Sequence, residues 1–145
     1  MKASTSHSIN VSSSTEHLRE VRNFVQNFVQ QFDVNKNDLD EIILAVDEAY
    51  TNIIKHAYNN DPNQTVKIEL GTSTDTLWVQ LSDTGFHFNA DEYQPPDLLK
   101  RIKNKQRGGM GVYLIHKLMD SVEYSSAGKT NTILLLANVS MNPLP

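Results

Sequence analysis

The sequence predicts an α+β fold: a two-layer sandwich with one mixed, mostly antiparallel sheet and helices on one face. Two patterns support this prediction. Long segments repeat apolar residues every three or four positions, as amphipathic helices do, whereas shorter segments alternate apolar and polar residues, as strands do. The elements follow the order β-α-α-β-β-loop-α-β-β, which groups strands together instead of alternating them with helices as a parallel sheet does.

The N-terminal half is expected to hold one strand and two helices. A short strand is predicted at 7–12. The helix at 14–32 can be capped by the hydroxyl of Ser14 or Thr15, and its apolar residues recur at the spacing of a buried helix face. The helix at 37–58 is followed by an Asn-Asn-Asp-Pro turn, which ends it.

The C-terminal half is expected to hold four strands and one helix. Strands are predicted at 64–70 and 77–82, joined by a turn-rich loop. A helix at 110–119 then leads into two strands, at 121–125 and 130–138, which close the chain.

A long irregular stretch separates the first predicted strand pair from the third helix. It covers about residues 84–108 and contains two consecutive prolines and a run of lysines and arginines. A loop of this length in a compact domain is usually functional or disordered. Its basic side chains would attract a negatively charged ligand.

Composition bounds the class of protein. A chain of 145 residues that is 39% hydrophobic fits one domain, 1–145. Its net charge of −4 and pI near 5.7 argue against general nucleic-acid binding. Without cysteine it has no disulfide, thiol nucleophile or cysteine metal site. No apolar run approaches the roughly 18–20 residues of a membrane helix, and the start of the chain lacks a signal peptide. We therefore expect a cytoplasmic protein that binds neither nucleic acid nor membrane.

Three glycines occur in four positions just before the third predicted helix. The segment reads Arg107-Gly108-Gly109-Met110-Gly111. Glycine lets a backbone lie flush against a ligand, and the start of a helix directs free N–H groups and a positive dipole end toward it. The pattern predicts a phosphate cradle, although a tight strand-to-helix turn has the same appearance.

The second predicted helix carries four polar side chains along one edge of its apolar arc: Glu48, Asn52, Lys55 and His56. The oxygen of Asn52 suits a hard cation such as Mg²⁺. Glu48, one turn earlier, could hold a water or take a proton, and Lys55 could meet phosphate as a point charge. The alternative is the ordinary polar face of a surface helix. Asp47 is expected to face solvent or to adjoin the strand layer.

A third motif, Asp83-Thr84-Gly85, follows a predicted strand. The carboxylate can accept a hydrogen bond from an exocyclic amine such as that of adenine. The glycine lets a flat base lie against the backbone. A plain Asp-Thr-Gly turn is the alternative.

Together the three segments resemble the GHKL (HATPase_c) ATP-binding superfamily, which has the Bergerat fold. More narrowly they resemble the anti-sigma factor serine/threonine kinases of bacterial partner-switching systems. The family's N-box, Glu-x-x-x-Asn-x-x-x-His-Ala, is matched by Glu48, Asn52, His56 and Ala57. Its two glycine boxes correspond to 83–85 and 107–111, and 128–132 resembles its final strand-entry segment. The resemblance extends from about residue 8 to 138.

The resemblance implies ATP and Mg²⁺ as cofactors and a role for each matching residue. Asn52 would coordinate Mg²⁺, and Glu48 would be the general base that activates the substrate hydroxyl. Asp83 would read the adenine amine, with Gly85 and Thr132 in its pocket. Residues 84–108 would form the ATP lid. The candidate nucleotide-binding residues are Asn52, Lys55, His56, Asp83, Gly85, Lys105, Arg107, Gly108, Gly109, Met110, Gly111 and Thr132.

Two residues depart from the family pattern. His87 stands where the superfamily often has a second glycine, which puts the local lid geometry in doubt. Lys55 is not typical of the anti-sigma kinases and stands where sensor histidine kinases commonly place a basic residue.

The family transfers the γ-phosphate of ATP to a serine of an antagonist protein, sequesters a sigma factor and often forms homodimers. We therefore expect a serine/threonine-protein kinase with an antagonist-protein substrate, a sigma factor as partner and a homodimeric state. Two alternatives stay open. One is a non-catalytic ATP-binding module that sequesters a regulatory protein. The other is a detached histidine-kinase catalytic module. It is less favoured because the helix at 14–32 is too short for a phosphoacceptor hairpin.

Overall fold

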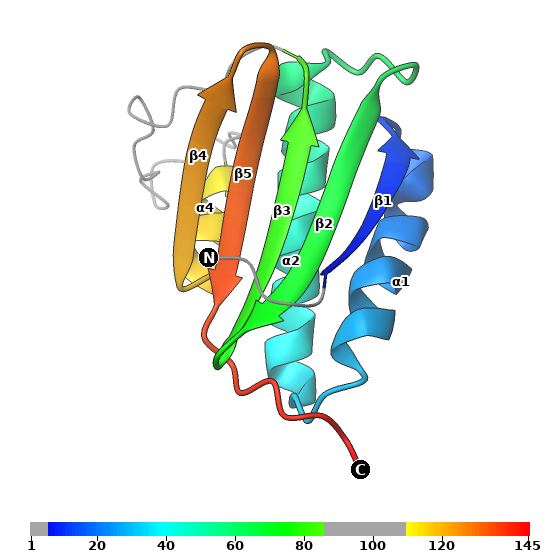
Figure 1. The fold of residues 1–145 in the computed structure, drawn as a ribbon. Helices are drawn as coiled ribbons and strands as arrows, with labels where there is room; N and C mark the ends of the chain where they lie inside the picture. Colours follow the sequence, from blue (N-terminus) through cyan, green and yellow to red (C-terminus); the bar gives the residue numbers. More distant parts are fainter. Residues whose placement is uncertain (1–5, 86–109) are drawn as a thin grey trace, which may run out of the picture.

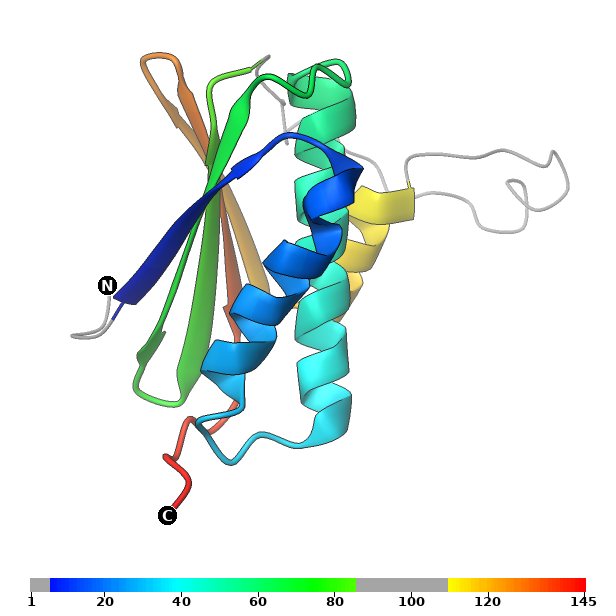
Figure 2. The same cartoon turned by 90° about the vertical axis from the view of Figure 1, so that its right-hand side faces the viewer.

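The described residues form a five-stranded sheet. Their helices pack against a single face of it, as Figures 1 and 2 show. The computed structural model describes residues 6–85 and 110–145. The described strands lie in the order β1-β2-β3-β5-β4, and each pairs with its neighbour antiparallel. The predicted α+β sandwich is confirmed, and its described sheet is wholly antiparallel where the sequence predicts a mixed one.

Each predicted element is present, with bounds close to those expected. The strands are β1 (Ser6–Ser12), β2 (Thr65–Ser73), β3 (Thr76–Asp83), β4 (Ser121–Ala127) and β5 (Thr130–Ala137). The helices are the 3-10 turn η1 (Thr15–His17), α1 (Leu18–Val29), α2 (Lys36–Asn52), the π-helical turn η2 (Ile53–Ala57) and α4 (Met110–Leu118). Within these described parts, each helix is too short or too polar to cross a membrane.

Helix caps explain where η1 and α2 begin. The Ser14 side chain accepts a hydrogen bond from the Glu16 amide at 3.2 Å, so Ser14 is the predicted cap of η1. The second helix starts slightly earlier than the sequence predicts. Its cap is Asn35, whose side-chain oxygen accepts from the Asp38 amide at 2.8 Å.

The core lies between the sheet and the helix layer. On α1, Val21, Val25 and Phe28 form the buried stripe that their spacing predicts. On α2, Tyr50 is fully buried, and its hydroxyl lies 2.8 Å from the carbonyl oxygen of Ser14. This contact ties the last turn of α2 to the chain that leaves β1. Burial raises the pKa of Tyr50.

Asp47 does not face solvent, contrary to the sequence-based expectation. Its side chain is only 14% exposed, and Oδ2 lies 2.6 Å from Nε of Arg22 on α1. Its other oxygen, Oδ1, is buried and has no hydrogen-bond partner. Burial raises the pKa of Asp47, while the Arg22 guanidinium acts in the opposite direction. A helical wheel of α2 alone marks Asp47 as polar surface, but α1 covers that surface.

The strand order makes β3 the middle strand of the sheet. β3 pairs with β2 on one side and with β5 on the other. Its last residue, Asp83, pairs with Asn131 at the start of β5. The third predicted motif therefore ends the central strand, beside the β4–β5 hairpin.

Candidate functional site

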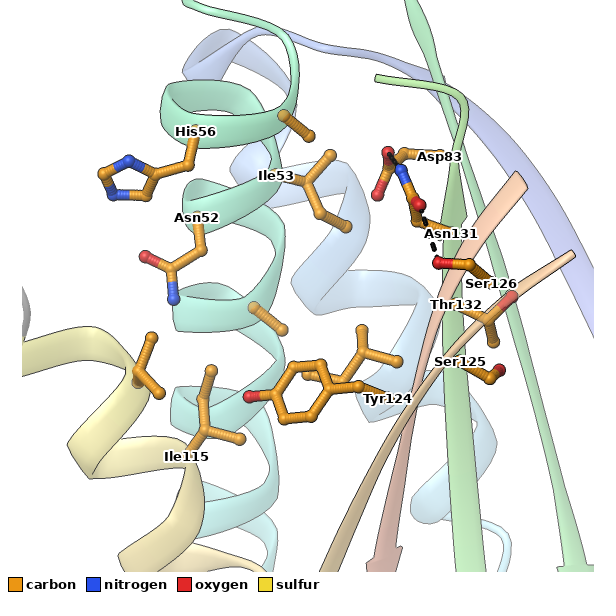
Figure 3. Close-up of a pocket in the computed structure, with 14 residues that line it drawn as sticks. Asn52, Ile53, His56, Asp83, Ile115, Tyr124, Ser125, Ser126, Asn131 and Thr132 are labelled. Atoms are coloured by element: carbon orange, nitrogen blue, oxygen red, sulfur yellow. Dashed lines mark hydrogen bonds between the residues drawn. The ribbon is translucent and has the colours of Figure 1, made fainter. Parts of the chain in front are cut away.

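A pocket lies between the helix layer and the sheet, at the end where β3 stops (Figure 3). It encloses about 140 Å³. Its lining residues are Ala49, Asn52, Ile53, His56, Ala57, Asp83, Val112, Ile115, Tyr124, Ser125, Ser126, Asn131, Thr132 and Ile133. An apolar wall with a few polar groups at its edge is typical of a small-molecule site.

The helix side of this pocket carries Asn52 and His56, which Figure 3 shows one turn apart. Asn52 is half-buried at the end of α2, and His56 is exposed in η2. Glu48 is half-buried one turn before Asn52, and Lys55 is exposed, but neither lines the pocket. Two of the four predicted helix residues thus reach the pocket, and the other two lie outside its wall.

The helix changes from α to π geometry at the pocket. The Tyr58 amide donates to the carbonyl of Ile53, five residues earlier, at 3.0 Å. Asn59 and Asn60 then adopt positive φ angles of 51° and 62°, which end the helix. π turns are rare and frequently occur at functional sites. Here the wider turn carries His56.

On the sheet side, Asp83 presents its carboxylate, and the residue as a whole is only 7% exposed. Its Oδ1 accepts two hydrogen bonds, from the Gly85 amide at 2.9 Å and from Nδ2 of Asn131 at 3.0 Å. No hydrogen bond from the described residues reaches Oδ2. The pocket therefore has an acceptor oxygen at its edge that can receive a ligand N–H group.

Asn131 is a site residue that the sequence analysis does not assign a role. Its Nδ2 donates to Asp83 Oδ1 and, at 3.0 Å, to the carbonyl oxygen of Gly85. Its Oδ1 accepts from the Ser126 hydroxyl at 3.1 Å, and Figure 3 shows the contacts of Asn131 with Asp83 and Ser126. The predicted Thr132 also lines the pocket, yet the residue before it contacts Asp83. Only the β3–β5 register reveals that pairing.

Gly85 packs directly against the helix end. A Cβ atom at this position would lie 2.1 Å from the carbonyl oxygen of Ala57 and 2.9 Å from its Cβ. A side chain therefore cannot be accommodated without movement of backbone. The sequence suggests that this glycine leaves space for a flat base. The structure adds a second reason, which is its close packing against Ala57.

Tyr58, the residue that follows η2, braces the same region. Its hydroxyl accepts from the Thr84 amide at 2.8 Å and donates to the Thr65 carbonyl at 2.7 Å. One side chain therefore joins the helix end, the start of β2 and the residue after β3.

Residues of α4 and β4 complete the lining of the pocket. Val112 and Ile115 of α4 line the pocket, so the helix after the glycine-rich segment borders the site as predicted. Tyr124 of β4 also lines it, with its hydroxyl 3.4 Å from Nε2 of His116. Burial lowers the pKa of His116, which favours a neutral imidazole at neutral pH.

The remaining predicted residues are described in part or not at all. Met110 and Gly111 are the first two residues of α4. The others lie outside the described residues, as does almost all of the predicted lid: His87, Lys105, Arg107, Gly108 and Gly109.

Known proteins similar in sequence cover nearly the whole chain. The model of the histidine kinase-like ATPase domain family matches residues 11–136. The anti-sigma F factor of Oceanobacillus iheyensis is 35% identical over 126 residues, which cover 86% of each chain. The serine-protein kinase RsbW of Bacillus subtilis is 30% identical over 116 residues, covering 77% of this chain and 72% of the relative.

Solved structures show the same fold. The RsbU and RsbW domains of a Mycobacterium tuberculosis protein match 97% of this chain with a TM-score of 0.66 and 14% identity, over 33% of their own chain. The Acinetobacter baumannii histidine kinase AdeS matches 94% of this chain with a TM-score of 0.53 and 13% identity, over 68% of its own chain. These structural likenesses agree with the family match in sequence, and the chain belongs to the histidine kinase-like ATPase domain family.

Proposed function

We propose that this protein is an ATP-dependent serine/threonine-protein kinase that regulates transcription or signalling by partner switching. The observation that carries the proposal is Asp83, which holds an acceptor oxygen at the edge of a mostly apolar pocket. A buried carboxylate of this kind suits the exocyclic amine of adenine. The relatives named anti-sigma F factor and serine-protein kinase favour a kinase that acts on other proteins.

The base would bind against the apolar wall that includes Ala49, Ile53 and Ile133. Asp83 would accept its amine, and Thr132 would add a hydroxyl to the same pocket. These groups fit a flat base with one donor, because the pocket offers apolar surface and a single carboxylate.

The phosphates would extend toward the helix edge that carries Asn52 and His56. Asn52 would hold Mg²⁺ through its amide oxygen. No three His, Cys, Asp or Glu side chains gather within residues 6–85 and 110–145, so phosphate and water would supply the other ligands. When bound, Mg²⁺ neutralises charge on the phosphates. Lys55 and His56 are proposed phosphate contacts.

The glycine-rich segment is proposed to complete the phosphate site. Gly108, Gly109, Met110 and Gly111 would donate backbone N–H groups at and before the start of α4. Lys105 and Arg107 would approach the γ-phosphate.

Glu48 is proposed as the general base. It lies one turn before Asn52, beyond the pocket wall, where an incoming protein can approach the helix. The serine or threonine hydroxyl of the substrate would pass its proton to the Glu48 carboxylate as its oxygen bonds the γ-phosphorus and ADP leaves. The substrate would be an antagonist protein, a sigma factor would be a second partner, and the protein would act as a homodimer.

Phosphate transfer to purified antagonist proteins tests this proposal. With γ-labelled ATP and Mg²⁺, we expect acid-stable label on the antagonist. Glu48→Gln should lower the transfer rate about hundredfold or more, the usual size of a general-base effect, and leave ADP affinity nearly unchanged. Glu41→Gln, on the same face two turns earlier, is the control and should transfer at the normal rate.

The outcomes separate the candidate functions. ADP binding without transfer to any antagonist would identify a non-catalytic ATP-binding module. Label that is lost in acid would indicate phosphohistidine and the catalytic module of a histidine kinase. Absence of adenine-nucleotide binding by the folded protein would reject all three.

A further inference from the structure

We propose that Asn131 orients Asp83 and thereby makes the pocket select a 6-amino purine over a 6-oxo purine. The inference rests on the nucleotide-binding function proposed above and adds a positioning residue to it. Asn131 lies at the start of β5, opposite Asp83 in the β3–β5 ladder.

The orientation of the Asn131 amide is fixed by its partners. Its nitrogen faces Asp83 Oδ1 and the Gly85 carbonyl oxygen, each at 3.0 Å. Neither a carboxylate nor a carbonyl can donate, so the NH₂ end must face them. The amide oxygen then faces the Ser126 hydroxyl, which donates to it at 3.1 Å. The donor and acceptor character of these groups therefore determines which end of the amide points to Asp83.

This arrangement holds the Asp83 carboxylate in one position. Oδ1 receives both the Asn131 amide and the Gly85 N–H, so rotation of the carboxylate would break two hydrogen bonds in a buried place. Oδ2 is left as an acceptor for the ligand. A 6-amino group donates to it, whereas a 6-oxo group would bring two acceptors together without a proton between them.

An asparagine is required because one atom must donate twice. The Nδ2 atom has two hydrogens, and Asp83 and Gly85 each take one. Threonine or serine has a single hydroxyl hydrogen, and aspartate has none when ionised. Asn131→Asp would also place a second negative charge beside Asp83, and the two like charges would repel each other.

A purely structural role for Asn131 predicts a different result. Loss of a brace between β5 and the end of β3 would weaken binding of all purine nucleotides alike. Loss of a positioning residue changes the discrimination between them. The informative quantity is therefore the ratio of ADP affinity to inosine diphosphate affinity, since these ligands differ at position 6 of the purine.

Calorimetric titration of the full chain with each diphosphate in Mg²⁺ tests the inference. For the unaltered protein we expect a clear preference for ADP. In Asn131→Asp and Asn131→Ala we expect the ADP-to-inosine-diphosphate affinity ratio to fall about tenfold or more, the size expected for a hydrogen bond to a charged group. Ser126→Ala keeps the amide but removes its anchor and should lower the ratio by a smaller factor.

The control is Asn10→Asp, the same change at an exposed position of β1, which should keep the normal ratio. Thermal melting identifies variants that do not fold, and Asn131→Ala replaces Asn131→Asp if the added charge prevents folding. An unchanged ratio in the folded Asn131 variants, with normal ADP binding by the unaltered protein, would overturn the inference alone. Failure of the unaltered protein to bind ADP would overturn the proposed function as well.

Discussion

The carbonyl oxygen of Ala57 lies 2.1 Å from the place that a Cβ atom would take at Gly85. The end of β3 thus meets the end of the α2–η2 helix backbone to backbone. This contact fixes the separation between the carboxylate of Asp83 and the helix edge that carries Asn52. The site depends on a junction that tolerates no side chain.

Gly85→Ala should destabilise the protein by about 1–3 kcal/mol, as overpacking of a tight site usually does. ADP affinity should fall with it, because the junction moves Asp83 away from the helix. Urea denaturation and calorimetry measure the two effects. Gly128→Asn is the control: it lies at φ 62° with open space around it, and asparagine tolerates that backbone conformation. Equal stability of Gly85→Ala and the unaltered protein would contradict the packing argument.

Asp83→Asn should weaken ADP binding about tenfold or more, because it removes a charged acceptor from the adenine amine. Affinity for inosine diphosphate should rise, since an amide can donate to a 6-oxo group. Calorimetric titration of both nucleotides checks this. Asp75→Asn, in the β2–β3 turn at φ 51°, makes the same chemical change far from the pocket and should alter neither affinity. Retention of full ADP affinity by Asp83→Asn would refute the assigned role of Asp83.

Tyr58→Phe should cost about 1–3 kcal/mol of stability, since it leaves the Thr84 amide and the Thr65 carbonyl without their partner. Chemical denaturation measures the loss. Tyr113→Phe is a matched control, because no hydrogen bond from the described residues reaches the Tyr113 hydroxyl. Similar stabilities for the two variants would show that the Tyr58 hydroxyl contributes little.

Asp47 should make stability depend on pH in a defined direction. Burial raises the pKa of Asp47 above its usual 3.8, so the folded protein binds this proton more tightly than the unfolded chain does. The contribution of Asp47 to stability is fully present below about pH 3.8 and is lost as the pH rises through the raised pKa. Because Asp47→Asn cannot titrate, its free energy of unfolding relative to the unaltered protein should be higher at pH 7 than at pH 3.

Urea denaturation at several pH values measures this difference. Asp40→Asn removes a charge from the exposed Lys36–Asp40 pair on the same helix and should show a smaller pH dependence, because solvent screens that pair. A difference for Asp47→Asn that falls between pH 3 and pH 7 would show that the Arg22 attraction outweighs burial.

The elements of this fold could be predicted from the sequence because their signals are local. The apolar spacing of Val21, Val25 and Phe28 identifies α1, and Ser14 is a recognisable cap for the 3-10 turn that precedes it. The motifs around Asn52 and Asp83 could be identified in the same way, and the structure brings both to one pocket. Their assigned roles, and that of Glu48, stay predictions.

The parts that could not be predicted depend on contacts between distant segments. Asn131 meets Asp83 across 48 positions, and the sequence does not specify the register that pairs them. Asp47 is polar and so looks exposed on a helical wheel, yet Arg22 of α1 covers it. The π turn at Ile53–Ala57 has no periodic signal, because it is short and changes only which carbonyl an amide bonds, as the Tyr58 amide does with Ile53.

The central position of β3 has a consequence for the dynamics of recognition. A strand hydrogen-bonded along both edges belongs to the part of a protein whose amide hydrogens exchange slowly, since exposing them requires subglobal or global opening. Asp83 ends this strand, so its backbone is ordered before any ligand arrives. The carboxylate loses its conformational entropy when the protein folds. Ligand binding therefore carries a smaller entropy cost, which favours higher affinity.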